Sequence, residues 1–183
     1  MKGFKEWFHC PEGKMYYHQG HSWAIQESGN IVTVGIDDFA MKLMGNIDAI
    51  KLPQVGSKVT QGEKAWSLTV GSKSIDMLSP VDGKILDINE SLLSSPESIS
   101  KDPYGQFWLI IVYVQKIEAN FKNLLSGGIV SKWMEMVWET LYARMNYKLG
   151  ELSRDGGVLV DGIARNLDQE RWDEIVKEFF LTS

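Results

Sequence analysis

The sequence of 183 residues has only one cysteine, Cys10, so an intramolecular disulfide bond is excluded. No apolar run approaches the roughly 20 residues that a membrane-spanning helix needs. The first 15 residues lack the apolar stretch and the small-residue cleavage site of a signal peptide. The net charge of −5 argues against a protein that neutralises many nucleic-acid phosphates. These absences predict a soluble cytoplasmic protein with neither a membrane nor a nucleic-acid partner.

Motifs for catalysis and for metal binding are equally scarce. We find no Gly-rich phosphate-binding loop, no Ser/His/Asp set and no paired-carboxylate motif. Four potential metal ligands crowd the N-terminal region, namely His9, Cys10, His18 and His21. Their spacing matches no standard zinc pattern, and they include a single thiol. The sequence therefore predicts neither a metal site nor an enzyme active site.

The composition of the chain is typical of a globular protein with a core, because 44% of its residues are hydrophobic and 23% are charged. Its length is sufficient for one domain and an appendage. Residues 1–15 are predicted to form an N-terminal tail, residues 16–115 a domain of short strands, and residues 116–183 a helical C-terminal extension. The predicted organisation is therefore one β-rich domain with additions at both ends.

The middle zone alternates short β-branched runs with turns. The runs predicted to be strands include "NIVTVGI", "IDAIKLP", "KAWSLTV", "SIDMLSPV", "GKILDINE" and "QFWLIIVYV". Between them, "DDFAMKLMG" is predicted to be a short helix that Asp37 or Asp38 caps and that Gly45 ends. A second helical turn is predicted in "ESLLSSPESIS". The predicted fold class is mainly β with short helices.

Two amphipathic helices are predicted in the C-terminal extension. The first has an apolar residue at every fourth position: Ile129, Trp133, Val137 and Leu141. The second carries Trp172, Ile175, Val176, Phe179 and Phe180, with Asn166 and Gln169 as a capping box. Such wide aromatic faces need cover. They are predicted to pack on the domain or on each other, with a homodimer contact or a docking surface as the alternative.

One predicted hairpin, "KAWSLTVGSKSIDMLSPV", presents a lysine. Its two strands alternate apolar residues on one face each: Trp66, Leu68 and Val70, then Ile75, Met77 and Val81. The four residues "GSKS" between them predict a tight loop with Lys73 at its exposed tip. An attachment lysine for a group carrier such as lipoamide needs that placement, because a modifying enzyme must reach its amine. The alternative is a charged side chain that is simply solvated.

Four segments of the chain, in order and without large gaps, resemble the H protein of the glycine cleavage system. They are "HSWA" (21–24), "VGIDDFA" (34–40), "MGNIDAIKLPQVGSKVTQGE" (44–63) and "SPVDGKILDINESLLSSPESISKDPYGQFWLI" (79–110). The resemblance implies a lipoyl-type barrel-sandwich hybrid in which a hairpin presents a lipoyl-lysine. It also implies a noncatalytic carrier of an aminomethyl group. The implied partners are a glycine decarboxylase, an aminomethyltransferase and a flavin dehydrogenase.

The lysine itself departs from the family pattern, which is like Glu-Ser-Val-Lys-Ala. Counting inward from Gly62–Glu63 or from Pro80–Gly83 aligns the family lysine with Ser72, so Lys73 follows one residue late. On a regular strand, a shift of one residue turns the side chain to the opposite face of the sheet. Inside a loop the shift matters less, because loop residues do not alternate strictly. The hypotheses are a lipoyl group on Lys73, or a protein that kept the fold, lost the arm and acts as a scaffold or binding module. A lipoyl carrier for another pathway, such as sulfur metabolism, is a third.

Overall fold

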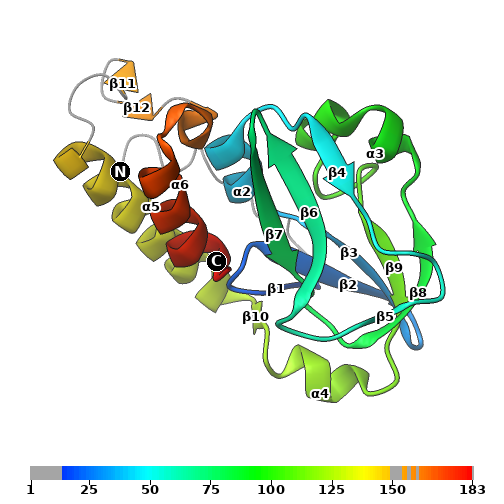
Figure 1. Cartoon of the computed structure of the whole chain (residues 1–183). Coiled ribbons are helices and arrows are strands. Elements are labelled where there is room, and N and C mark those ends of the chain that lie inside the picture. Colours follow the sequence, from blue (N-terminus) through cyan, green and yellow to red (C-terminus); the bar gives the residue numbers. More distant parts are fainter. Residues whose placement is uncertain (1–13, 149–153, 156–157, 160, 183) are drawn as a thin grey trace.

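The larger sheet of the protein has seven antiparallel strands (Figure 1). The computed structural model describes residues 14–148, 154–155, 158–159 and 161–182. In spatial order the strands are β10 (Leu125–Ser126), β1 (Met15–Tyr17), β2 (Ser22–Ser28), β3 (Ile31–Ile36), β9 (Ile110–Tyr113), β8 (Gly83–Ile88) and β5 (Lys58–Val59). Alternate residues of β3, such as Val32 and Val34, are fully buried, as expected for a strand with one face on the core.

A smaller, three-stranded antiparallel sheet carries the hairpin. Its order is β4 (Ala49–Lys51), β6 (Lys64–Val70) and β7 (Lys73–Leu78). The predicted apolar faces are buried, namely Trp66, Leu68 and Val70 on β6 and Ile75 and Met77 on β7. A separate pair, β11 (Arg154–Asp155) and β12 (Val158–Leu159), lies in the C-terminal part. The prediction of a mainly β fold with short helices is confirmed.

Helix α2 (Asp38–Met44) begins and ends where the sequence predicts. The Asp37 carboxylate accepts a hydrogen bond of 2.9 Å from the backbone N–H of Ala40, which satisfies one of the free donors of the first turn. The helix ends at Gly45, whose φ of 74° is costly for a residue with a Cβ atom. The buried face of α2, including Phe39 and Leu43, packs into the core.

The predicted boundary at residue 115 falls between β9 and the short helix α4 (Ile117–Phe121). Beyond it, β10 returns to the larger sheet and pairs with β1. The segment "ESLLSSPESIS" forms α3 (Ser91–Ser94) and a 3₁₀ helix (Pro96–Lys101), as predicted. Residues 1–13 of the predicted tail lie outside the described residues. Within the described part of the chain, no helix has both the length and the apolar character to cross a membrane.

The long helix α5 (Gly128–Lys148) forms as predicted, but its buried face differs from the predicted one. The predicted stripe was wrong at Ile129, whose side chain is 55% exposed. The buried side chains are Val130, Trp133, Met134, Trp138 and Leu141. A strict four-residue spacing drifts around the helix, because one turn takes 3.6 residues. The face that packs on the protein therefore alternates steps of three and four residues.

The end of the chain packs on the β-rich part, as predicted. A 3₁₀ helix (Ile163–Asn166) leads into α6 (Gln169–Ile175) and a wider helical turn (Val176–Phe180). The five apolar residues predicted for this face are all at least 95% buried: Trp172, Ile175, Val176, Phe179 and Phe180. The helix cap is Asp168, not the predicted Asn166, since the Asp168 carboxylate accepts the Arg171 N–H at 3.0 Å.

Figure 1 shows α5 and α6 together on one flank of the barrel, with α6 on the side of the β6–β7 hairpin. An ion pair joins the two helical regions, with 2.9 Å between Arg144 Nε and Glu178 Oε2. On the barrel side, the ring of Phe179 lies 5.6 Å from that of Phe39, and the Thr182 hydroxyl donates to the Asp76 carbonyl at 2.9 Å. The C-terminal extension and the barrel therefore share one core.

Candidate functional site

The hairpin turn is shorter than predicted. Val70 pairs with Lys73, so only Gly71 and Ser72 form the turn and Lys73 is the first residue of β7. Gly71 adopts a φ of 64°, a conformation typical of tight hairpin turns. Ser72 is exposed, whereas Lys73 is half-buried. The prediction of a four-residue loop with Lys73 at an exposed tip was wrong, because pairing continues up to the residue after the turn.

The Lys73 amine is held by the C-terminal extension. Its Nζ donates to the carbonyl oxygen of Arg165 at 3.2 Å and to that of Leu167. The same nitrogen lies 5.3 Å from the centre of the Trp172 ring, within the range of a cation–π contact. An ammonium group offers three N–H donors and a full charge, which match two carbonyls and an aromatic face. These partners were not predicted, because a backbone carbonyl leaves no trace in a sequence.

Asp48 connects the hairpin turn to the extension. Its Oδ2 accepts the Gly71 N–H at 2.6 Å and lies 2.9 Å from Arg165 Nη2. Arg165 also donates to the Asn46 carbonyl at 2.7 Å. The hydrogen bond from Gly71, followed by the one from Arg165, lowers the pKa of the Asp48 carboxyl. One exposed carboxylate thus orients both the turn that precedes Lys73 and the segment that binds its amine.

The extension reaches this site past the end of α2. The Gly162 N–H donates to the Lys42 carbonyl at 2.6 Å. The backbones of Gly45 and Gly162 approach so closely that a Cβ atom on Gly45 would lie 2.6 Å from the Gly162 Cα. A side chain at Gly45 would therefore displace the backbone of the extension, and at Gly162 the φ of 75° disfavours any residue with a Cβ atom. The path of the segment toward Lys73 is therefore set by a backbone contact as well as by the Arg165 ion pair.

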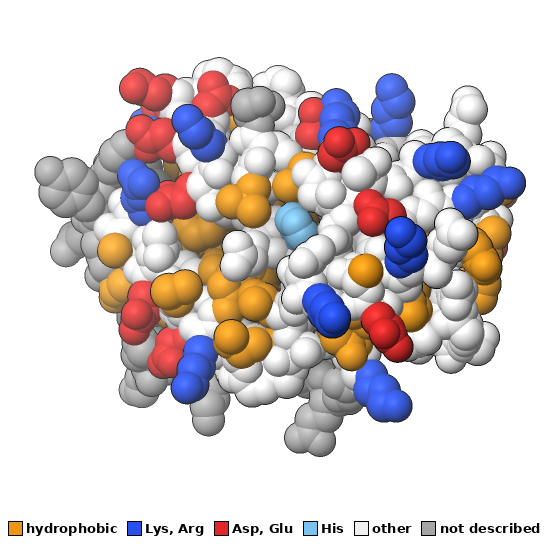
Figure 2. Space-filling model, turned by 90° about the horizontal axis from the view of Figure 1, so that it is seen from below, with side chains coloured by type: hydrophobic (Ala, Val, Ile, Leu, Met, Phe, Trp, Pro, Cys, Tyr) orange, Lys and Arg blue, Asp and Glu red, His pale blue; other side chains and the backbone are white. Residues whose placement is uncertain are grey.

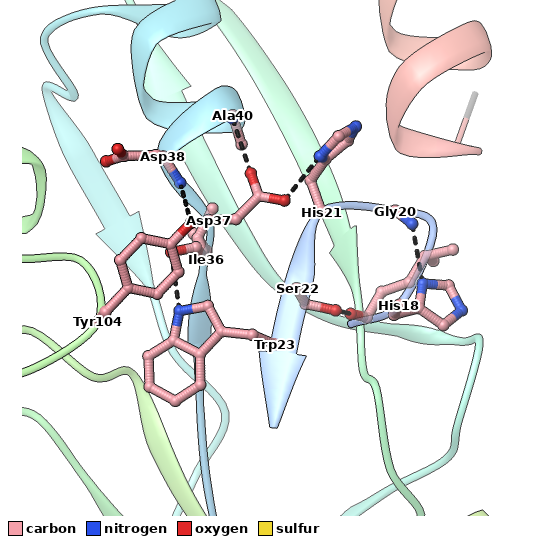
Figure 3. Close-up of polar contacts among 11 residues, drawn as sticks. His18, Gly20, His21, Ser22, Trp23, Ile36, Asp37, Asp38, Ala40 and Tyr104 are labelled. Carbon is pink, nitrogen blue, oxygen red and sulfur yellow. Dashed lines mark hydrogen bonds and ion pairs between the residues drawn. The ribbon is translucent and has the colours of Figure 1, made fainter. Parts of the chain in front are cut away.

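The "HSWA" motif has structural roles (Figure 3). His21 Nδ1 lies 2.8 Å from the Asp37 carboxylate that also caps α2, and its ring stacks on Phe39 and Trp133. The Trp23 indole N–H donates to the Ile36 carbonyl at 3.0 Å. These contacts fix the junction between β2, β3 and α2. They place the predicted core residue Trp23 inside, at 1% exposure.

Of the four possible metal ligands near the N-terminus, the structure describes His18 and His21. His9 and Cys10 lie outside the described residues. His18 Nδ1 accepts the Gly20 N–H at 3.0 Å, and burial together with the neighbouring His21 lowers the His18 pKa. Among residues 14–148 and the later described segments, no three potential ligands gather around one point.

The "DPYG" segment closes the same end of the barrel (Figure 3). The Tyr104 hydroxyl accepts the Asp38 N–H at 3.0 Å, and burial raises the Tyr104 pKa. Asp102 in turn accepts the Gln106 N–H at 2.9 Å. Both contacts hold backbone in place, as expected of a turn that leads into the last strand. Their role is to shape the scaffold that carries the hairpin.

Charged side chains are mixed in sign on the face seen in Figure 2. Lysine and arginine side chains lie among aspartate and glutamate, with apolar patches between them. A nucleic-acid-binding face typically gathers its basic residues into a patch or stripe. This face has no such arrangement.

Comparisons with known proteins identify the barrel. The family model described as "Glycine cleavage H-protein" matches residues 15–136. The glycine cleavage system H protein of Carboxydothermus hydrogenoformans is 37% identical over 119 residues, which cover 65% of this chain and 90% of that protein. The probable H protein 1 of Sulfolobus acidocaldarius is 41% identical over 111 residues, or 61% of this chain and 79% of that protein.

A solved structure agrees with the sequence comparisons. The crystal structure of a glycine cleavage system H protein from Mycobacterium marinum aligns with a TM-score of 0.59 and 26% identity, covering 70% of this chain and 99% of that one. The implied barrel-sandwich fold is confirmed. The family match ends within α5, before the segment that contacts Lys73. The chain thus belongs to the glycine cleavage H-protein family and continues past the matched part into a C-terminal segment that packs against its hairpin.

Proposed function

We propose that this chain is a noncatalytic carrier of a glycine cleavage system and that Lys73 is its lipoyl attachment residue. The observation that carries the proposal is the family match over residues 15–136, which includes the whole β6–β7 hairpin. Lys73 adjoins the turn of this hairpin, whereas Lys64 lies at its far end and pairs with Asp76. Lys73 is therefore the hairpin lysine that a modifying enzyme approaching the turn meets first.

The chemistry of Lys73 fits a lipoyl group, although its arrangement demands a movement. Attachment requires a primary amine, which Lys73 has and the exposed Ser72 lacks. The amine is occupied by the Arg165 and Leu167 carbonyls, so this contact must open before an enzyme can reach it. When bound, a lipoyl group supplies a dithiolane on a long tether. The barrel provides a rigid base for that tether.

The proposed partners follow from family membership. They are a glycine decarboxylase, an aminomethyltransferase and a flavin dehydrogenase, working with this chain in the cytoplasm. A homodimer through the C-terminal helices is a further prediction. Since the main aromatic faces of those helices are buried within the chain, such a contact rests on exposed α5 residues such as Ile129 and Met136.

A specific observation favours a second candidate, an H-type scaffold without a lipoyl arm. The residue aligned with the family lysine is Ser72, and the one lysine beside the turn is bound within the chain. In this alternative the hairpin and the C-terminal segment form a fixed binding surface for the partner enzymes.

The mass of the intact protein separates the two candidates. The protein is incubated with a lipoyl ligase and an activated lipoyl donor, beside the variants Lys73→Arg and Ser72→Lys. We expect a lipoyl adduct on the parent chain and none on Lys73→Arg, because arginine offers no acylable amine. An adduct that persists in Lys73→Arg places the site elsewhere. Modification of Ser72→Lys alone supports the scaffold and shows that register excludes Lys73.

A further inference from the structure

The structure assigns a second binding partner to the hairpin lysine, within the same chain. We propose that residues 162–182, here called the latch, form a binding site for the unmodified Lys73 ammonium, and that acylation of Lys73 releases the part of the latch around that site. The release is a property of this chain's own contacts. Its consequence for carrier function rests on the proposed lipoyl attachment.

The site is complementary to an ammonium ion. The Arg165 and Leu167 carbonyls are acceptors, and the Trp172 ring presents its negative face 5.3 Å from Nζ. The Asp168 carboxyl adds negative charge nearby, since the Lys73 charge contributes to its lowered pKa, after the larger effect of Arg171. Two acceptors, a ring face and an acidic side chain all favour a compact cation with several N–H donors.

Acylation removes what this site recognises. The Nζ lone pair attacks the carbonyl carbon of an activated acyl donor, an N–C bond forms, and the leaving group departs with the electrons of its bond. The ammonium loses two protons in all, and the resulting amide is neutral with a single N–H. One of the two carbonyls then loses its donor, the cation–π contact disappears, and the acyl chain needs the space beside Trp172.

The two halves of the latch contact the barrel differently, and this difference limits which residues acylation releases. Its first half has few ring contacts: beside the buried Leu167, it meets the barrel through the Lys73 amine, the ion pair between Arg165 and Asp48, and the Gly162 N–H bond. Its second half meets the barrel through buried rings, with Phe179 on Phe39 and Phe180 beside His21. We assign the release to residues 163–168, while the buried residues from Trp172 to Phe180 stay packed.

Thermodynamic linkage makes the effect reciprocal. A closed latch makes acylation less favourable, and the acylated lysine weakens the latch by the same free energy. Because the closed latch also occupies the amine, it slows the acylation. The unmodified protein therefore holds its hairpin covered, and modification itself uncovers the surface around the turn. A partner enzyme then distinguishes the two forms by the position of the segment as well as by the arm.

Hydrogen exchange on the full-length protein tests the latch without any lipoylation. Lys73→Gln removes the charge as acylation does, Lys73→Arg keeps a cation, and Lys64→Gln removes an exposed charge from the same hairpin. We expect faster exchange in peptides covering 163–168 in Lys73→Gln, by at least about threefold, with β3 unchanged and Lys64→Gln like the parent. Equal exchange in Lys73→Gln and the parent overturns the proposal, as does loss of protection throughout the barrel.

The acylation rate tests the reciprocal half. Arg165→Ala removes the ion pair to Asp48 but leaves the carbonyl, whereas Lys177→Ala removes an exposed cation from the half of the latch that stays packed. With a ligase and activated donor, we expect acylation of Arg165→Ala to be about two- to fivefold faster, the range for loss of an exposed ion pair. Lys177→Ala should match the parent.

Equal rates in the two variants overturn the gating. If neither the parent nor Ser72→Lys gains an adduct, the result counts against the proposed function instead. The hydrogen-exchange measurements then test the latch independently of lipoylation.

Discussion

Among single residues, Asp48 connects two parts of the site, because it binds the hairpin turn through Gly71 and the latch through Arg165. Both partners act on the charged form of its carboxyl and lower its pKa. Ser72 and Lys73 illustrate a second residue-level rule. A shift of one position between the turn and the strand decides whether a side chain faces solvent or the latch.

The Asp48 contacts predict a dependence of stability on pH. The folded pKa lies below the ordinary value of 3.8, so the stabilisation is fully present above that value and is lost as pH falls through the folded pKa. We expect Asp48→Asn to be less stable than the parent at pH 6, and the difference in unfolding free energy to shrink as pH falls below the ordinary pKa of 3.8. Denaturant titrations over this range measure it. A difference that stays constant with pH contradicts the assigned role of the charge.

Among the elements, the end of the chain behaves as part of the core. Its apolar face spans α6 and the following turn, and it covers Phe39 and His21 of the barrel. By contrast, α5 keeps some apolar side chains in solvent, including Met136 at 61% exposure. A substitution on the apolar face of α6 therefore removes packing in the core, whereas a substitution at an exposed apolar residue of α5 does not.

Trp172→Ala is expected to lower the unfolding free energy of the monomer by about 3 kcal/mol or more, because it empties a site that is 98% buried. Ile129→Ala on α5 is the control and should change the stability by less than about 0.5 kcal/mol. Thermal or denaturant unfolding measures both, and sedimentation follows the oligomeric state. An unchanged melting temperature in Trp172→Ala rules out the packing role. A shift from dimer to monomer with the barrel intact shows that the face serves a homodimer.

At the scale of the whole molecule, the barrel and the extension are continuous. Strand β10 lies beyond the predicted boundary at residue 115 and pairs with β1 at the edge of the larger sheet. Trp133 of α5 and Phe180 of the latch both contact the ring of His21. The sheet, the long helix and the latch thus meet around one buried side chain.

Limited proteolysis tests this continuity. The predicted boundary implies a protected fragment that ends near Gln115, whereas the pairing of β10 favours a fragment that extends past Ser126. We expect the longer fragment. Mass spectrometry of the fragments identifies the ends. Early cleavage between "VGIDDFA" and "DPYG" is incompatible with a stable barrel.

Much of the fold could be predicted from the sequence alone, because it depends on local rules. Alternation along β6 and β7 determined which residues are buried, and Asp37 and Gly45 determined the ends of α2. The width of the aromatic stripe from Trp172 to Phe180 determined that this face must be covered. The same alternation and turns, together with the family motifs, were enough to identify the barrel.

Only the tertiary structure decided the length of the hairpin turn and the partners of the Lys73 amine. Strand pairing shortened the turn to Gly71 and Ser72. This pairing depends on which strand lies opposite and on the hydrogen bond that the Gly71 N–H donates to the Asp48 carboxylate. The partners of the Lys73 amine are backbone carbonyls of residues more than 90 positions away. Every residue carries such a carbonyl, so no residue type signals it. Whether a carbonyl meets a distant ammonium depends on how the chain folds back, and that is decided by packing of the entire molecule.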